Sequence, residues 1–180
     1  EQQLWGVKIM PNYRHQGIPG IDHLSRQIDE RITAKQCHSV VNQYGKKRML
    51  SELYGCSGGH MSFEDRLWIA TQQMCLGVNL LNPHLALYTM AGCRKRDYPP
   101  NLSYQQPWWP LNNVIDEALA RTCVALSQGR YHPEALIVHP QESTFVLWQS
   151  KSLTSGSAIQ GEDQVWDFCR ELLKRRYIRI

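Results

Sequence analysis

The sequence has 180 residues, enough for one domain or for one domain and part of another. Hydrophobic residues make up 42% and charged residues 20%, as in ordinary soluble globular proteins. The net charge of +4 is mild and its basic runs are short, which argues against a nucleic-acid surface. No run approaches the roughly 18 apolar residues of a membrane span. We therefore expect neither nucleic acid nor membrane as a partner.

Six cysteines occur in the sequence, and no two of them form a C-x-x-C pair, which argues against a structural zinc site. We expect buried free thiols, which favour a reducing, cytoplasmic compartment. The sequence does not exclude disulfide bonds. The first residues, EQQLWGVKIM, contain no signal-peptide pattern, and the last four, Tyr177 to Ile180, read as the opening of a strand. Both ends suggest a piece of a longer chain, so export is not decided.

The first half of the chain predicts helices alternating with short buried strands. One helix has a buried face at i, i+3, i+4 and i+7 and a glycine cap, formed by Cys37, Val40, Val41, Tyr44 and Gly45. A short strand follows from Met49 and ends at Glu52. The next helix starts with a capping box at Ser62 to Asp65, and its buried stripe is Leu67, Ala70 and Met74, with Gly77 at its end. A second strand, 78–82, stops at Pro83.

The second half begins with a long irregular segment, 85–110, rich in proline and aromatic residues. A segment of this length inside a compact domain is usually functional or disordered, and its aromatics argue against disorder. A third helix is predicted over 112–127, with Ile115, Leu119, Thr122 and Leu126 on one face. A strand at 135–139, a short apolar run at 145–148, a helix from about 162 to 176 and a strand at 177–180 complete the pattern. Such alternation predicts a parallel α/β fold.

Ligand sites in parallel α/β folds lie at the carboxyl ends of the strands, where Glu52 and His84 would meet. Glu52 precedes the glycine-rich loop 55–59 and is the best candidate for one of the two carboxylates of a glycoside hydrolase. A thiol enzyme using Cys56 and His60 is a weaker alternative, because no surrounding motif supports it. A carbohydrate-binding or structural α/β module without turnover is the third hypothesis.

Several short stretches together resemble the α-L-rhamnosidase-type glycoside hydrolases of family 106. They are Ser39-Val40-Val41-Asn42-Gln43-Tyr44-Gly45-Lys46, Leu50-Ser51-Glu52-Leu53-Tyr54-Gly55, Met61-Ser62-Phe63-Glu64-Asp65, Gly77-Val78-Asn79, Pro83-His84, Arg94-Lys95-Arg96-Asp97-Tyr98-Pro99-Pro100 and Gln106-Pro107-Trp108-Trp109. They cover roughly residues 20 to 140, and their combined order is more specific than any one of them.

The resemblance implies the later part of a (β/α)₈ TIM-type barrel over residues 1–131. It implies the start of a flavodoxin-like α/β domain over residues 132–180. It also implies an inverting hydrolase of terminal deoxy-sugars with two catalytic glutamates. Only Glu52 matches that pair here, so the partner is expected upstream of residue 1 and the chain alone is expected to be inactive.

The expected site therefore consists of one catalytic residue, Glu52, and five residues that contact the sugar, Tyr54, Asn82, His84, Trp108 and Trp109. The expected partners are a carbohydrate substrate and the rest of the parent chain. Lys95, Arg96 and Asp97 are expected to order the aromatic loop. No metal ligand set is identified and no cofactor is expected. Only the resemblance suggests a calcium ion near the sugar. The resemblance also allows a periplasmic or secreted location.

Overall fold

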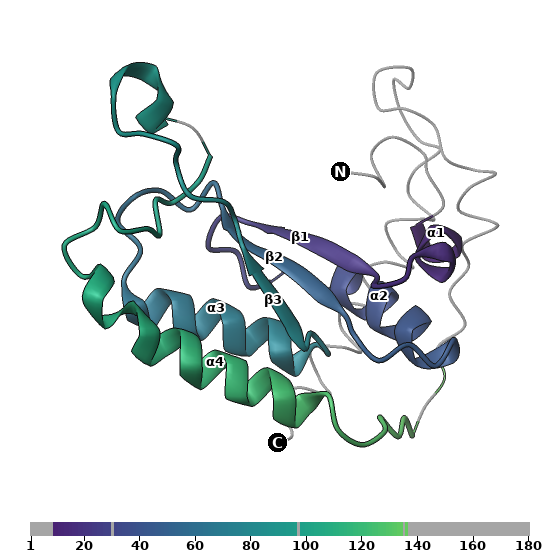
Figure 1. Ribbon diagram of the computed structural model, residues 1–180. Helices are drawn as coiled ribbons and strands as arrows, with labels where there is room; N and C mark the ends of the chain where they lie inside the picture. Colours follow the sequence, from purple (N-terminus) through teal and green to yellow (C-terminus); the bar gives the residue numbers. More distant parts are fainter. Residues whose placement is uncertain (1–8, 30, 97, 135, 137–180) are drawn as a thin grey trace, which may run out of the picture.

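The computed structural model describes residues 9–29, 31–96, 98–134 and 136, and its centre is a parallel sheet. Strands β1 (Gly20–Leu24), β2 (Leu50–Gly55) and β3 (Leu80–Pro83) lie in the order β1-β2-β3. Helix α2 (Ile32–Gln43) joins the first two strands and α3 (Phe63–Cys75) joins the second and third. Figure 1 shows α3 beside α4 (Asn112–Leu126), along one face of the sheet. The predicted parallel α/β class is thereby confirmed.

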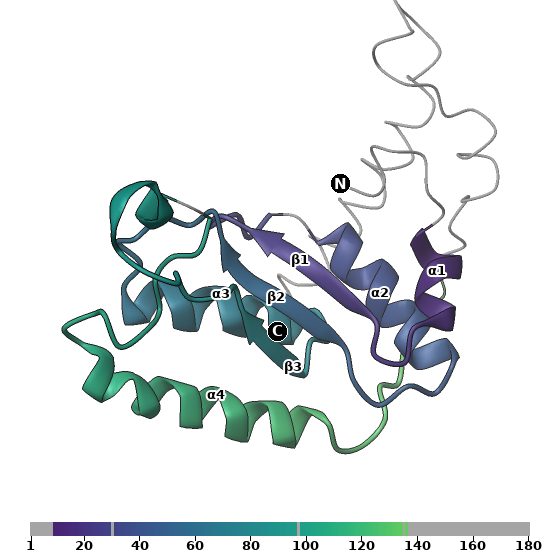
Figure 2. The same ribbon diagram turned by 45° about the horizontal axis from the view of Figure 1, so that its top comes forward.

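The core lies between the sheet and the helices, in two apolar clusters. One joins α1 (Ile9–His15) and α2 to the start of the sheet, through Ile9, Tyr13, Ile21, Cys37, Val40, Val41 and Met49. The other joins α3 and α4 to β2, through Leu53, Ile69, Ala70, Met74, Ile115 and Leu119. Each fully buried side chain of this size contributes roughly 1.5–3 kcal/mol. In the described part of the chain no helix covers the opposite face of the sheet, which we call the open face (Figure 2).

The helix boundaries follow local signals that the sequence displays. Ser62 accepts a hydrogen bond from the amide of Asp65, and the Asp65 carboxylate accepts one from the amide of Ser62, which completes the predicted capping box. Gly45 has a φ of 62° just after α2, as a C-terminal cap requires. The third predicted helix, 112–127, is confirmed by α4.

The predicted buried faces are partly wrong. Tyr44 lies beyond the end of α2 and is 50% exposed, with its ring 5.2 Å from the guanidinium of Arg14. In α3 the buried stripe contains Arg66 and Ile69, and Leu67 is exposed. In α4 the side chain of Cys123 is buried, whereas Thr122 and Leu126 are exposed. The other predicted positions are buried as expected: Cys37, Val40 and Val41 in α2, Ala70 and Met74 in α3, and Ile115 and Leu119 in α4.

The strands differ more from the prediction. Strand β2 continues to Gly55 because Leu53 and Tyr54 are both buried, so Glu52 is its third residue and does not end it. Strand β3 begins at Leu80, because the side chain of Asn79 is bound in the preceding turn by Met49 N–H and Lys47 C=O. Strand β1 and helix α1 were not predicted at all.

The segment 85–110 is irregular, as predicted, and contains two short 3₁₀ helices, η2 (Gly92–Arg96) and η3 (Trp109–Leu111). Among the thiols, Cys37 and Cys123 are buried as expected, but Cys56, Cys75 and Cys93 are exposed. No helix in the described ranges is long and apolar enough to cross a membrane. Asp97 and the elements predicted over 137–180 lie outside the described residues, as does nearly all of the expected second domain. The barrel stays a prediction.

Candidate functional site

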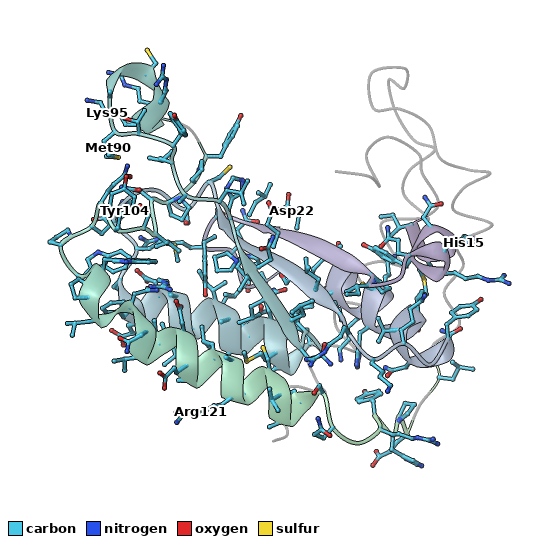
Figure 3. The ribbon with its side chains drawn as sticks, in the orientation of Figure 1. His15, Asp22, Met90, Lys95, Tyr104 and Arg121 are labelled. Atoms are coloured by element: carbon cyan, nitrogen blue, oxygen red, sulfur yellow. The ribbon has the colours of Figure 1, made fainter. Side chains whose placement is uncertain are left out.

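A row of polar side chains crosses all three strands on the open face. Asp22 pairs with Glu52, and Glu52 pairs with Asn82. Register partners on parallel strands point to the same face. Asp22 and Asn82 are exposed and the Glu52 side chain is 37% exposed. Figure 3 shows Asp22 on the side of the sheet away from α3 and α4. The row therefore places two carboxylates and an amide next to one another.

Asp22 is the residue that sequence reasoning missed. It lies in a five-residue strand with only Ile21 and Leu24 as strongly apolar residues, too little for a strand signal. The alternation was nevertheless present, because Ile21 and His23 are buried whereas Asp22 and Leu24 are exposed. A period of two with one polar face is typical of a strand covered on one side.

An irregularity in β2 sets which residues reach the open face beyond Glu52. Asp22 pairs with Glu52 but Leu24 pairs with Gly55, so β2 carries one extra residue, a β-bulge. Tyr54 has a φ of 74° there and is 1% exposed. Its hydroxyl donates a hydrogen bond to the carbonyl of Arg66 at 3.0 Å. The predicted sugar contact Tyr54 thus lies among the helices.

The bulge and the glycine together make room for His84. The amide of His84 donates to the carbonyl of Leu53 at 2.7 Å, which extends the β2–β3 pairing by one residue. A Cβ atom on Gly55 would lie within 3.1 Å of both the His84 ring and the Leu24 side chain. The space above Gly55 is therefore filled by the imidazole.

His84 lies beside Glu52 on the open face. His84 Nε2 lies 3.7 Å from Glu52 Oε1, and the His84 side chain is 22% exposed. His84 Nδ1 is buried and has no hydrogen-bond partner within the described ranges. An imidazole at this distance can hold the carboxylate in place and interact with its charge.

Trp108 belongs to a buried cluster around Arg66. The Arg66 guanidinium is 2% exposed and lies 5.7 Å from the centre of the Trp108 ring. It donates to Asn112 Oδ1 at 2.7 Å and to Asp116 Oδ1 at 3.1 Å. Trp108 also meets Phe63 edge-on, with ring centres 5.2 Å apart. The cluster fixes the aromatic segment to α3 and α4. Trp109 is 39% exposed.

The described residues give little support to a thiol enzyme or to a metal site. No hydrogen bond joins Cys56 to His60 there. No group of three or more His, Cys, Asp or Glu side chains in the described ranges is placed to hold a metal ion. The calcium implied by the resemblance thus has no ligand set among these residues.

Comparison with known proteins gives one informative similarity. No family model and no curated protein matches the sequence. The fold is similar to the solved structure of a rhamnosidase from Novosphingobium sp. PP1Y, with a TM-score of 0.53 and 18% identity. The match covers 67% of this chain and 13% of the rhamnosidase chain, so this chain spans a small part of that neighbour's length. At this identity the likeness shows the fold alone: the chain is an α/β unit that resembles part of that rhamnosidase.

Proposed function

We propose that the chain supplies part of the active site of a glycoside hydrolase acting on terminal deoxy-sugars such as α-L-rhamnosides. The observation that carries the proposal is the open-face row, in which Glu52 lies between Asp22 and Asn82 and beside His84. Glycosidic hydrolysis requires two carboxylates flanking the sugar, and Glu52, with polar groups beside it that can bind hydroxyls, supplies one of them. The fold similarity to part of the rhamnosidase structure supports the class of sugar.

We assign Glu52 as the general acid or base of an inverting reaction. Inverting enzymes keep their two carboxyl groups about 6.5–9.5 Å apart, so that a water molecule fits beside the sugar. Asp22 and Glu52 are register partners on neighbouring strands, whose backbones lie about 4.8 Å apart, and we take their carboxyl groups to be closer than an inverting reaction needs. Asp22 therefore binds sugar hydroxyls, and the second catalytic glutamate comes from another part of the parent protein. The isolated chain is inactive for that reason.

The other residues of the site orient the reacting groups. His84 holds the Glu52 carboxylate, and the exposed amide of Asn82 binds a sugar hydroxyl. The exposed Trp109 ring packs on the apolar face of the sugar. Tyr54 and Trp108 support the site from below, because both rings lie against the buried guanidinium of Arg66.

The test is hydrolysis of aryl glycosides, an α-L-rhamnoside included, by the parent protein and by its Glu52→Gln variant. The amide keeps the shape of the side chain and removes the titratable group. We expect the variant to lose roughly 10²–10⁴-fold in kcat, the usual contribution of general acid–base catalysis. Glu64→Gln is the matched control, because Glu64 is exposed at the start of α3. NMR of the first product formed should show the inverted anomer.

Three outcomes would overturn the proposal in different ways. A Glu52→Gln variant with full activity removes Glu52 from the chemistry. A retained anomer assigns Asp22 as the partner of Glu52, since retaining pairs lie only about 5–5.5 Å apart. If the parent protein binds saccharides but hydrolyses none, the carbohydrate-binding hypothesis replaces the hydrolase proposal.

A further inference from the structure

A second feature lies beyond the carboxyl ends of the strands, outside the polar row. It is a cavity of about 410 Å³, within the usual size range of small-ligand pockets. Its walls come from the loop after β2 and from the irregular segment, and include Cys56, Gly58, Leu87, Lys95, Arg96 and Tyr98. In Figure 3 the labelled Met90 and Lys95 mark this part of the molecule. We call it the loop pocket.

The loop pocket is held together by specific hydrogen bonds. The amide of Cys56 donates to the carbonyl of Tyr98 at 3.1 Å, which ties the β2 loop to the irregular segment. The side-chain amide of Asn101 contacts the Met90 sulfur at 3.2 Å, and Asn101 Oδ1 accepts from the hydroxyl of Ser103 at 3.0 Å. Asn101 is 4% exposed, so this wall is part of the packed structure.

The charge of the described lining is positive. Lys95 and Arg96 lie on η2, are exposed, and have no carboxylate partner among the described residues. No described lining residue is acidic. Asp97 lies outside the described residues. An arginine fork and a lysine ammonium on one wall attract a carboxylate or a sulfate ester.

The remaining lining suits a sugar ring. The Tyr98 side chain is 66% exposed, and Leu87 and Met90 add apolar surface. Asn101 and Gln106 bring amide groups to the same walls. A mixture of an aromatic ring, apolar surface and a few polar groups is typical of a small-molecule pocket.

We propose that the loop pocket binds an acidic sugar residue, a uronate or a sulfated sugar, next to the sugar that Glu52 cleaves. This placement in the substrate rests on the proposed function. Lys95 and Arg96 then favour substrates that carry an acidic sugar, in addition to ordering the aromatic segment.

The experiment measures binding to the parent protein by calorimetry with three probes: trigalacturonate, a sulfated trisaccharide and a neutral trisaccharide of the same length. The variant Lys95→Gln with Arg96→Gln should weaken binding of an acidic probe by on the order of tenfold or more, because it removes two charge-assisted contacts. Binding of the neutral probe should not change. Arg94→Gln is the matched control, since Arg94 lies on the same 3₁₀ helix but does not line the pocket.

A second measurement, the rate of thiol alkylation, needs no substituted protein. Cys56 lines the pocket and Cys75 does not, and both thiols are exposed. An acidic trisaccharide should slow alkylation of Cys56 and leave Cys75 unchanged. Equal protection of both thiols, equal binding of the three probes, or an equal loss in Arg94→Gln would overturn the proposal. The acidic probe that binds more tightly identifies the uronate or the sulfate ester.

The two proposals fail separately. If Glu52→Gln abolishes turnover but keeps binding of the acidic probe, both stand. If no glycoside is cleaved while the double variant still loses the acidic probe, the pocket stands and the hydrolase proposal falls. If turnover depends on Glu52 but charge makes no difference to binding, the loop pocket proposal falls alone.

Discussion

A Cβ atom added to Gly55 would lie 2.9 Å from Cδ2 of His84, so the imidazole occupies the space that any larger residue at position 55 would need. Gly55→Ala should therefore displace His84 from Glu52. We expect turnover by the parent protein to fall by roughly 10²-fold, the cost of misplacing a catalytic group by about an ångström. Gly17→Ala is the control, because nothing lies within 4 Å of a Cβ there and Gly17 does not line the loop pocket. Undiminished turnover in Gly55→Ala would show that His84 has no part in orienting Glu52.

Asp116 and Glu117 are neighbouring acids on α4 that each pair with an arginine, and they should differ in importance. Asp116 faces the buried Arg66, whereas Glu117 pairs with Arg121 on the helix surface. Asp116→Ala leaves a buried guanidinium with one hydrogen-bond partner fewer. Because Asp116 is half exposed, we expect a loss of about 1–2 kcal/mol in the free energy of unfolding. Glu117→Ala should cost about 0.5 kcal/mol or less. Urea unfolding of both variants checks this, and equal losses would contradict it.

Gly77→Ala should be among the most damaging glycine substitutions. Its φ is 111°, and a Cβ there would lie 2.3 Å from Cδ2 of His38. We expect a loss of about 2–4 kcal/mol, from backbone strain and from the collision with the ring. Gly129→Ala separates the two causes, since Gly129 has a φ of 78° but no neighbour within 4 Å. Similar thermal unfolding of the two variants would mean that the contact with His38 contributes nothing.

His38 should make the folded protein less stable in mild acid. Burial, with a smaller effect of Lys35, lowers the pKa of His38 from 6.5 to about 4. The unfolded chain therefore takes up this proton at a higher pH than the folded chain. The contribution of His38 to stability is complete above about pH 6.5 and is lost as the pH falls towards 4. Because the side chain is half-buried, we expect about 1–3 kcal/mol over that window.

The measurement for His38 is the urea midpoint between pH 4 and 7. His38→Gln removes the titration and should flatten the curve over this range, whatever its effect on stability at pH 7. A slope that persists in the variant would assign the pH dependence to other groups.

The sequence predicts the helices of this fold better than its sheet. The start of α3 could be predicted because the Ser62–Asp65 capping box is made within four residues of chain. Strand β1 could not be predicted, because two of its five residues, Asp22 and His23, are polar and its pairing partner lies far along the chain in β2. The irregularity in β2 that turns Tyr54 towards the helices depends on pairing with β1, which the local sequence of β2 does not show.

The candidate site shows the same division. Glu52 and His84 could be selected from their places near strand ends, and the structure brings them together. Asp22 was missed with its strand. Trp108 is predicted at the sugar because aromatic rings often stack there, and in the structure its ring packs edge-on against Phe63. The buried Arg66 that organises this packing lies on a helix face that the apolar pattern assigned to Leu67.

The polar row also has a regular position in the chain, at residues 22, 52 and 82, one from each strand. Each strand with its following helix thus supplies one side chain, and each position can change by a single substitution without altering the others. An insertion in the turns before β2 or β3 leaves the row intact, whereas one extra residue before Glu52 within β2 would turn its carboxylate towards the helices. Evolution can therefore vary the chemistry of this face one unit at a time, while the length of the strands stays fixed.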